Sequence, residues 1–112
     1  MEVIIQSLGF TAGEELESFV QEKIARLENR GGKIIRANVT LFLRPKRTHE
    51  NNSCEIRLEI PGNDLFVKKN HVHFENAITE SIDALDIMLR KEKEKRIDRR
   101  RHAKGGDERN QF

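Results

Sequence analysis

Apolar residues recur along the chain with two different spacings, which predict four strands and two helices. The chain opens with a β-branched run, Glu2–Leu8, that Gly9 closes. Residues 33–45 and 53–60 alternate between apolar and polar positions, the pattern of half-buried strands. A Pro-Gly turn then leads into residues 65–69, LFVKK, which predict a short fourth strand. The inward-facing positions of the two alternating strands are Ala37, Val39, Leu41 and Leu43, and Cys54, Ile56, Leu58 and Ile60.

Two further stretches carry apolar stripes at helical spacing. The first helix is expected to start with a capping box formed by Thr11 and Glu14, and to end where Gly31-Gly32 supplies a positive φ. Its stripe consists of Leu16, Phe19, Val20, Ile24 and Leu27. The second helix is expected from Phe74 to Arg101. Its stripe consists of Phe74, Ala77, Ile78, Ser81, Ile82, Leu85, Met88 and Leu89.

The element order β-α-β-β-β-α predicts an α+β fold in which two helices pack on one face of a four-stranded sheet. A right-handed first crossover would make the first two strands parallel. After the first strand, the order α-β-β-β-α resembles that of a double-stranded RNA-binding module. We expect a single domain over residues 1–101, followed by a polar, disordered tail over 102–112.

Charge is distributed unevenly, although the net charge of the chain is only +2. Residues 1–89 contain 11 Lys or Arg and 14 Asp or Glu, a net −3, whereas residues 90–104 contain nine and three, a net +6. The second helix therefore becomes strongly basic where its apolar stripe ends, after Leu89. A solvated, charged helix end would explain this pattern, and so would a surface that binds phosphate groups.

The phosphate-binding interpretation assigns the basic residues to one surface. Lys91, Lys95 and Arg99 follow one another at i,i+4 spacing along one helix face. Lys23 and Arg26 of the first helix would extend the surface if the two helices lie side by side. The cations that surround the first set are Arg90, Lys93, Arg96, Arg100 and Arg101.

Enzymatic and metal-binding sites find little support in the residues. His71 and His73 could bind a metal, but zinc needs three or four ligands and no Cys or acid accompanies them, so a helix entry is the alternative we favour. Cys54 lies at an inward strand position and is expected to be a small buried residue rather than a nucleophile. No phosphate-binding glycine loop or catalytic constellation is present, and we expect neither an enzyme nor a bound cofactor. Without a leader peptide or an apolar span, the sequence predicts a cytoplasmic protein.

Four stretches carry a resemblance to a known family. They are FVQEKIARLE in the first helix, CEIRLEIPG before the turn, HFENAITESIDAL at the start of the second helix, and LRKEKEK within it. In this order and spacing, residues 1 to about 97 resemble the short ribosome hibernation promoting factors, which include the ribosome-associated inhibitor and are also called sigma-54 modulation proteins.

The resemblance implies a non-enzymatic protein that binds the small ribosomal subunit and its ribosomal RNA. Binding would occur in the channel for messenger and transfer RNA, and would inhibit translation during stationary phase or stress. Lys23 and Arg26 match basic positions of the family's first helix, and Lys91, Lys93 and Lys95 match those of its second. Two positions depart from the family pattern: His73-Phe74-Glu75 replaces an Asp-x-Tyr motif, and Glu92 replaces a His.

A second class of function remains open from the residues alone. The basic helix could belong to a protein-interaction module and bind an acidic protein partner. Co-sedimentation with small ribosomal subunits that is lost at high salt would separate a ribosome-binding factor from such a module.

Overall fold

The computed structural model describes residues 1–29, 32–45 and 51–105, and from residue 98 onward it describes only the course of the backbone. The elements follow the predicted order, β1 (Glu2–Leu8), α1 (Glu14–Glu28), β2 (Arg36–Leu43), β3 (Asn52–Ile60), β4 (Asn63–His71) and α2 (Phe74–Gly105). The fold is therefore the predicted α+β arrangement.

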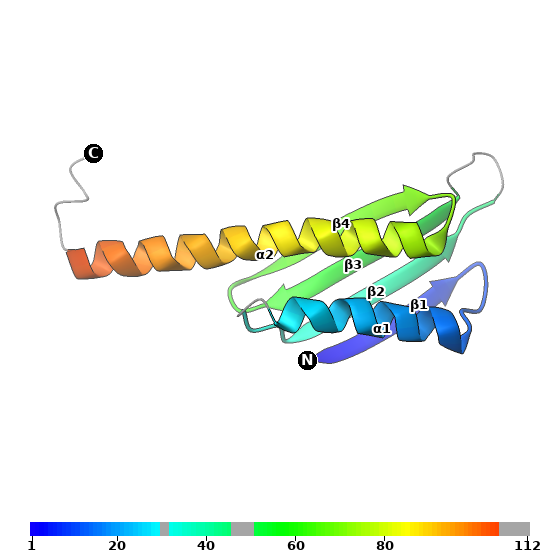
Figure 1. The fold of residues 1–112 in the computed structure, drawn as a ribbon, viewed down its shortest axis with the longest axis horizontal. Coiled ribbons are helices and arrows are strands. Elements are labelled where there is room, and N and C mark those ends of the chain that lie inside the picture. The colour runs from blue at the N-terminus through cyan, green and yellow to red at the C-terminus, as the bar shows by residue number, and fades with distance from the viewer. Residues whose placement is uncertain (30–31, 46–50, 106–112) are drawn as a thin grey trace.

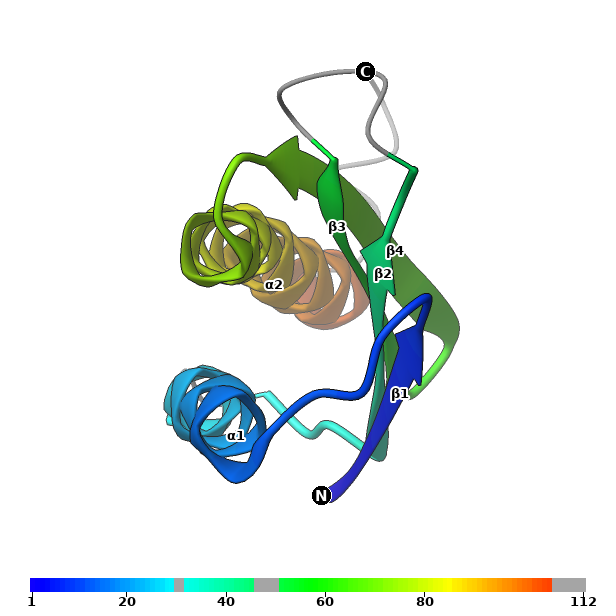
Figure 2. The ribbon, with the colours of Figure 1, turned by 90° about the vertical axis from the view of Figure 1, so that its right-hand side faces the viewer.

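The four strands form one sheet in sequence order. β1 pairs with β2 in parallel, while β2–β3 and β3–β4 are antiparallel. Both helices lie on the same face of this sheet, and the other face carries no helix (Figure 2). The two-layer arrangement and the parallel first pair were both predicted from the sequence, and both are confirmed.

The core lies between the sheet and the helices. The inward positions of β2 and β3 are buried as predicted, except that Leu43 at the end of β2 is only half-buried. Ser53 faces the opposite side of the sheet but is also fully buried, and its hydroxyl donates a hydrogen bond to Oδ1 of Asn70 at 2.6 Å. From the helices the core receives Val20, Ile24, Leu27, Ala77, Ile78, Ser81, Ile82, Leu85 and Leu89.

The first helix does not start as predicted. α1 starts at Glu14 with Gly13 as its N-cap residue, and no side chain caps it. The segment before it is held instead by the Oγ of Ser7, which accepts a hydrogen bond from the Ala12 N–H at 3.3 Å. The helix ends at Glu28, and Gly32 has no positive φ, while Gly31 lies outside the described residues.

The second helix is longer than predicted, since it runs to Gly105 rather than ending at Arg101. Its 32 residues correspond to about 48 Å at 1.5 Å per residue. The longest extent of the molecule is 57 Å, and Figure 1 shows α2 continuing well past the sheet and α1. The remaining residues of the predicted tail, 106–112, lie outside the described part of the chain.

Gly9, between β1 and α1, is a position where only glycine fits. Its φ is +81°, and an added Cβ would lie 2.5 Å from the carbonyl oxygen of Leu43. We expect Gly9→Ala to lower the free energy of unfolding by about 2 kcal/mol or more, because the left-handed backbone is strained and the clash is with backbone. Urea unfolding would measure this loss. Gly32→Ala is the matched control, since no atom lies within 4 Å of its added Cβ. A Gly9→Ala midpoint equal to that of Gly32→Ala would contradict the expectation.

Candidate nucleic-acid interface

The projecting part of α2 carries most of the predicted cations. Among the described side chains of the helix, Leu89 is the last buried one, and the charged segment begins immediately after it at Arg90. Arg96 is half-buried, whereas the side chains of Arg90, Lys91, Lys93 and Lys95 are exposed. Arg99, Arg100 and Arg101 belong to the same helix, but their side chains lie outside what the structure describes.

Few of the cations whose side chains the structure describes are neutralised by an ion pair. Lys95 lies 3.4 Å from the carboxylate of Glu92, and its side chain is still 66% exposed. A surface pair of this kind contributes only about 0.2–1 kcal/mol, so a phosphate can compete with it. Within the described ranges, no ion pair involves Arg90, Lys91 or Lys93. The projecting helix thus presents positive charge that is available to a partner.

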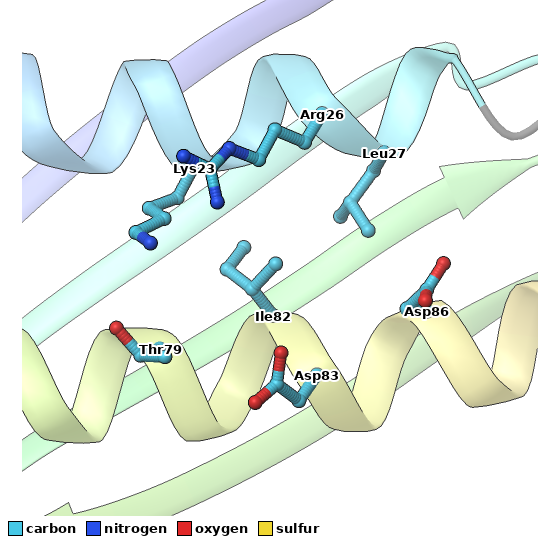
Figure 3. A pocket seen from close by; sticks show the side chains of 7 residues that line it. All are labelled: Lys23, Arg26, Leu27, Thr79, Ile82, Asp83 and Asp86. Carbon is cyan, nitrogen blue, oxygen red and sulfur yellow. The ribbon is translucent and has the colours of Figure 1, made fainter.

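The first helix adds its two predicted cations along the packed part of α2. α1 and α2 lie side by side on the sheet, which is the condition under which Lys23 and Arg26 were expected to join the surface (Figure 2). In Figure 3, the Lys23 side chain points toward α2, and the Arg26 side chain lies along α1 with its guanidinium beside Lys23. Nζ of Lys23 also lies 5.3 Å from the centroid of the Phe19 ring, a favourable cation–π contact.

The space between the helices, here called the α1–α2 groove, contains acids that the sequence analysis did not anticipate. It encloses about 110 Å³, and it is lined by Lys23, Arg26, Leu27, Thr79, Ile82, Asp83 and Asp86. The spacing of Thr79, Asp83 and Asp86 places them along one flank of the buried stripe of α2. That flank was visible in the sequence, but its position opposite Lys23 and Arg26 depends on how α1 packs.

The cations of α2 face two different directions. Seven residues are close to two full helical turns, so Arg90 follows Asp83, and Lys93 follows Asp86, on the groove side of the helix. Lys91 and Lys95 are rotated from Arg90 by about 100° or more. The groove side and the Lys91–Lys95 side therefore present separate rows of positive charge on one rod.

The outer face of the sheet differs from the helical face, because its cations are paired with carboxylates. Arg36 lies 2.9 Å from Glu2 and 3.0 Å from Glu59, Arg57 lies 3.7 Å from Asp64, and Lys68 lies 3.7 Å from Glu55. Hydrogen bonds to Glu2 and then to Glu59 raise the pKa of Arg36. Hydrogen bonds from Asn38 and then from Arg36 lower the pKa of Glu59. This face offers far less uncompensated positive charge than α2.

The remaining candidate residues, Cys54, His71 and His73, make contacts typical of structural rather than catalytic or metal-binding residues. Cys54 is fully buried, and burial raises the pKa of its thiol to about 11 despite a hydrogen bond with Ser81, so the predicted buried role is confirmed. Nδ1 of His71 accepts a hydrogen bond from the His73 N–H at 3.2 Å, and its Nε2 lies 3.8 Å from Glu80. Across the described residues, no group of three potential ligands surrounds a metal position.

No helix in the described part of the chain is long and apolar enough to cross a membrane.

The fold is that of two solved structures with low sequence identity. The N-terminal domain of Protein Y from Thermus thermophilus matches with a TM-score of 0.69 and 22% identity, covering 81% of this chain and 98% of that one. A ribosomal subunit interface protein from Coxiella burnetii matches with a TM-score of 0.72 and 12% identity, covering 83% and 98%. At these identities, the likeness concerns the fold.

The chain belongs to the family described as Sigma 54 modulation protein / S30EA ribosomal protein, whose model matches residues 3–97. It is 32% identical over 92 residues to the ribosome hibernation promotion factor of Deinococcus radiodurans, and these cover 81% of this chain but only 48% of the relative. It is also 32% identical over 95 residues to the ribosome hibernation promoting factor of Pseudomonas putida, covering 85% and 89%. The chain therefore spans about half of the first relative and most of the second. This membership confirms the resemblance, and it agrees with the expectation that the protein is not an enzyme.

Proposed function

We propose that the protein is a ribosome hibernation factor that binds the small ribosomal subunit in the channel for messenger and transfer RNA, and so inhibits translation during stationary phase or stress. The observation that carries this proposal is the group of exposed cations that follows Leu89 on α2. Of these, Arg90, Lys91 and Lys93 have no ion-pair partner among the described residues. The names of the relatives, ribosome hibernation promoting factors, supply the ribosome as the partner.

The mechanism is occupancy rather than catalysis. Lys and Arg that contact RNA phosphates release counterions, a gain that does not depend on base sequence. The projecting α2 helix is about 10–12 Å wide including its side chains. It can lie between RNA strands while the sheet remains outside the space between those strands. A protein held in this way blocks the RNA ligands that use the same space. Its contact residues are the exposed cations of α2, together with Arg96, Arg99, Arg100 and Arg101 and the groove residues Lys23 and Arg26.

A competition experiment tests this mechanism. Purified protein is bound to vacant small subunits, and messenger RNA with initiator transfer RNA is added at rising concentration. We expect both RNA ligands to displace the protein, because the three would share one site. The affinity for the subunit should fall steeply with salt, with a log–log slope of about −0.7 to −0.9 per phosphate contact.

The measurements are pelleting of the subunits with quantification of the bound protein, and translation of a reporter message in a purified system. Stable binding of protein, messenger and transfer RNA to the same subunit would refute the channel site while leaving RNA binding intact. Binding that does not change with salt, or that is lost when acidic ribosomal proteins are stripped from the subunit, would favour the protein-interaction module instead.

A further inference from the structure

The α1–α2 groove combines chemical groups that a simple phosphate site would not. Lys23 and Arg26 form the α1 wall, Thr79 and Asp83 stand on the α2 wall, and the nearly buried side chains of Leu27 and Ile82 lie between the helices (Figure 3). A carboxylate opposite two cations weakens the attraction for a bare phosphate. The groove is therefore better matched to a ligand that carries an anion and hydrogen-bond donors together.

The groups that would contact such a ligand are available. No ion pair joins Lys23 or Arg26 to a residue in the described ranges, and Asp83 is exposed without a hydrogen bond or ion pair to any of those residues. Asp86 is engaged in an interaction of its own, so it is not assigned a ligand-binding role. The volume of about 110 Å³ is well below the roughly 300–1,000 Å³ of pockets for whole small molecules. A flat nucleobase whose sugar and phosphate extend toward solvent is thus a more suitable occupant than a completely enclosed metabolite.

We propose that the α1–α2 groove holds one guanine nucleotide of the bound RNA, an inference that rests on the proposed function and adds base selectivity to it. The N1–H and N2–H groups of guanine donate side by side to the two oxygens of the Asp83 carboxylate. The nucleotide's phosphate lies between Lys23 and Arg26, and the face of the base contacts the apolar floor formed by Leu27 and Ile82. Unstacked bases of single-stranded RNA are recognised through such edge contacts.

The choice of guanine follows from the pattern of donors on each base. Guanine alone has two adjacent N–H donors on its Watson–Crick edge, which a carboxylate can accept in the bidentate manner that makes charged hydrogen bonds strong. Cytosine and adenine each present one donor beside a ring-nitrogen acceptor, which a carboxylate repels. The single N–H of uracil stands between two carbonyl oxygens, so uracil should fit least well.

The test uses the full chain and labelled single-stranded RNA octamers of uridine whose fourth residue is guanosine, adenosine, cytidine or uridine. Fluorescence anisotropy at fixed salt should give a Kd about tenfold lower for the guanosine octamer than for the all-uridine octamer. Asp83→Asn should remove this preference, since a carboxamide offers only one acceptor. It should leave binding of the all-uridine octamer unchanged or tighter, because a charge that repels phosphate is lost.

Asp64→Asn is the matched control, because it makes the same change of charge on the outer face of the sheet. It should retain the guanosine preference, and unchanged circular dichroism melts should show that both variants are folded. Equal affinity of the wild-type protein for all four octamers would overturn the inference, as would a guanosine preference that survives in Asp83→Asn. Competition by free 5′-GMP as effective as that of the guanosine octamer would overturn the assignment to RNA. None of these results bears on salt-sensitive binding of the protein to small subunits. Absence of that subunit binding would instead count against the proposed function.

Discussion

Changing Lys91, Lys95 and Arg99 to Glu together is expected to eliminate detectable binding to small ribosomal subunits at physiological salt. The substitution removes three positive charges from one row of the projecting helix and adds three negative charges that repel phosphate. Each lost phosphate contact should reduce the magnitude of the log–log salt slope by about one. Co-sedimentation over a range of salt concentrations measures both the affinity and the slope.

Two further variants make the result interpretable. Glu residues at i,i+4 spacing repel one another and oppose the helix dipole, so the same three positions changed to Gln provide a neutral version that favours a helix. The Gln version should bind weakly and keep the native circular dichroism spectrum. Reversing Lys33, Arg57 and Lys68 changes the net charge equally outside the helices, and it should cost far less affinity. Subunit binding that is the same in all of these variants would show that α2 is not the binding surface.

Leu85→Ala is expected to produce the largest loss of stability. Leu85 is 0% exposed and sits in the middle of the α2 stripe, so truncation removes buried apolar contacts and leaves a cavity. Substitutions of this kind cost about 2–5 kcal/mol, which for a domain of this size lowers the Tm by about 10 °C or more.

Ile87→Ala on the same helix is its control, because the Ile87 side chain is 48% exposed. Its free energy of unfolding should stay within about 0.5 kcal/mol of the wild type. Thermal and urea unfolding of the two variants would compare a buried with an exposed position in one helix. Similar losses at Leu85 and Ile87 would mean that the packed face of α2 has been assigned incorrectly.

Most of the fold could be predicted because strand alternation and helical periodicity report directly which side chains are buried. The inward residues of β2 and β3 illustrate this, because alternate residues of a strand face opposite sides of the sheet and only one of the two sets is apolar. β4 was predicted as residues 65–69 and extends over Asn63–His71, because pairing with β3 imposes strand structure on polar residues at both ends. The predicted start of α1 was wrong because Thr11 and Glu14 match a capping box locally. In the structure, the segment before α1 is held instead by the hydrogen bond to Ser7 and by stacking of Phe10 on Phe74, with ring centroids 4.7 Å apart.

The candidate interface was only partly accessible from the sequence. The row of cations after Leu89 is contiguous, so composition alone locates it. The α1–α2 groove, by contrast, joins residues separated by more than fifty positions, and the opposition of Asp83 to Lys23 depends on the packing of two helices on a common sheet. Helical periodicity identifies the flank on which Asp83 lies, but it does not identify what that flank meets.

Because the first half of α2 is packed in the core, its basic half extends a helix that already exists. Nucleating a new helix is unfavourable by a factor of about 10⁻³, or about 4 kcal/mol, and isolated helices shorter than about 12–15 residues are marginal in water. The segment from Arg90 to Gly105 requires only propagation, in which each residue adds one hydrogen bond to the preceding turn. Mutual repulsion of its cations opposes propagation, and RNA phosphates would remove that repulsion. Extension of the helix and binding of the polyanion would then reinforce each other.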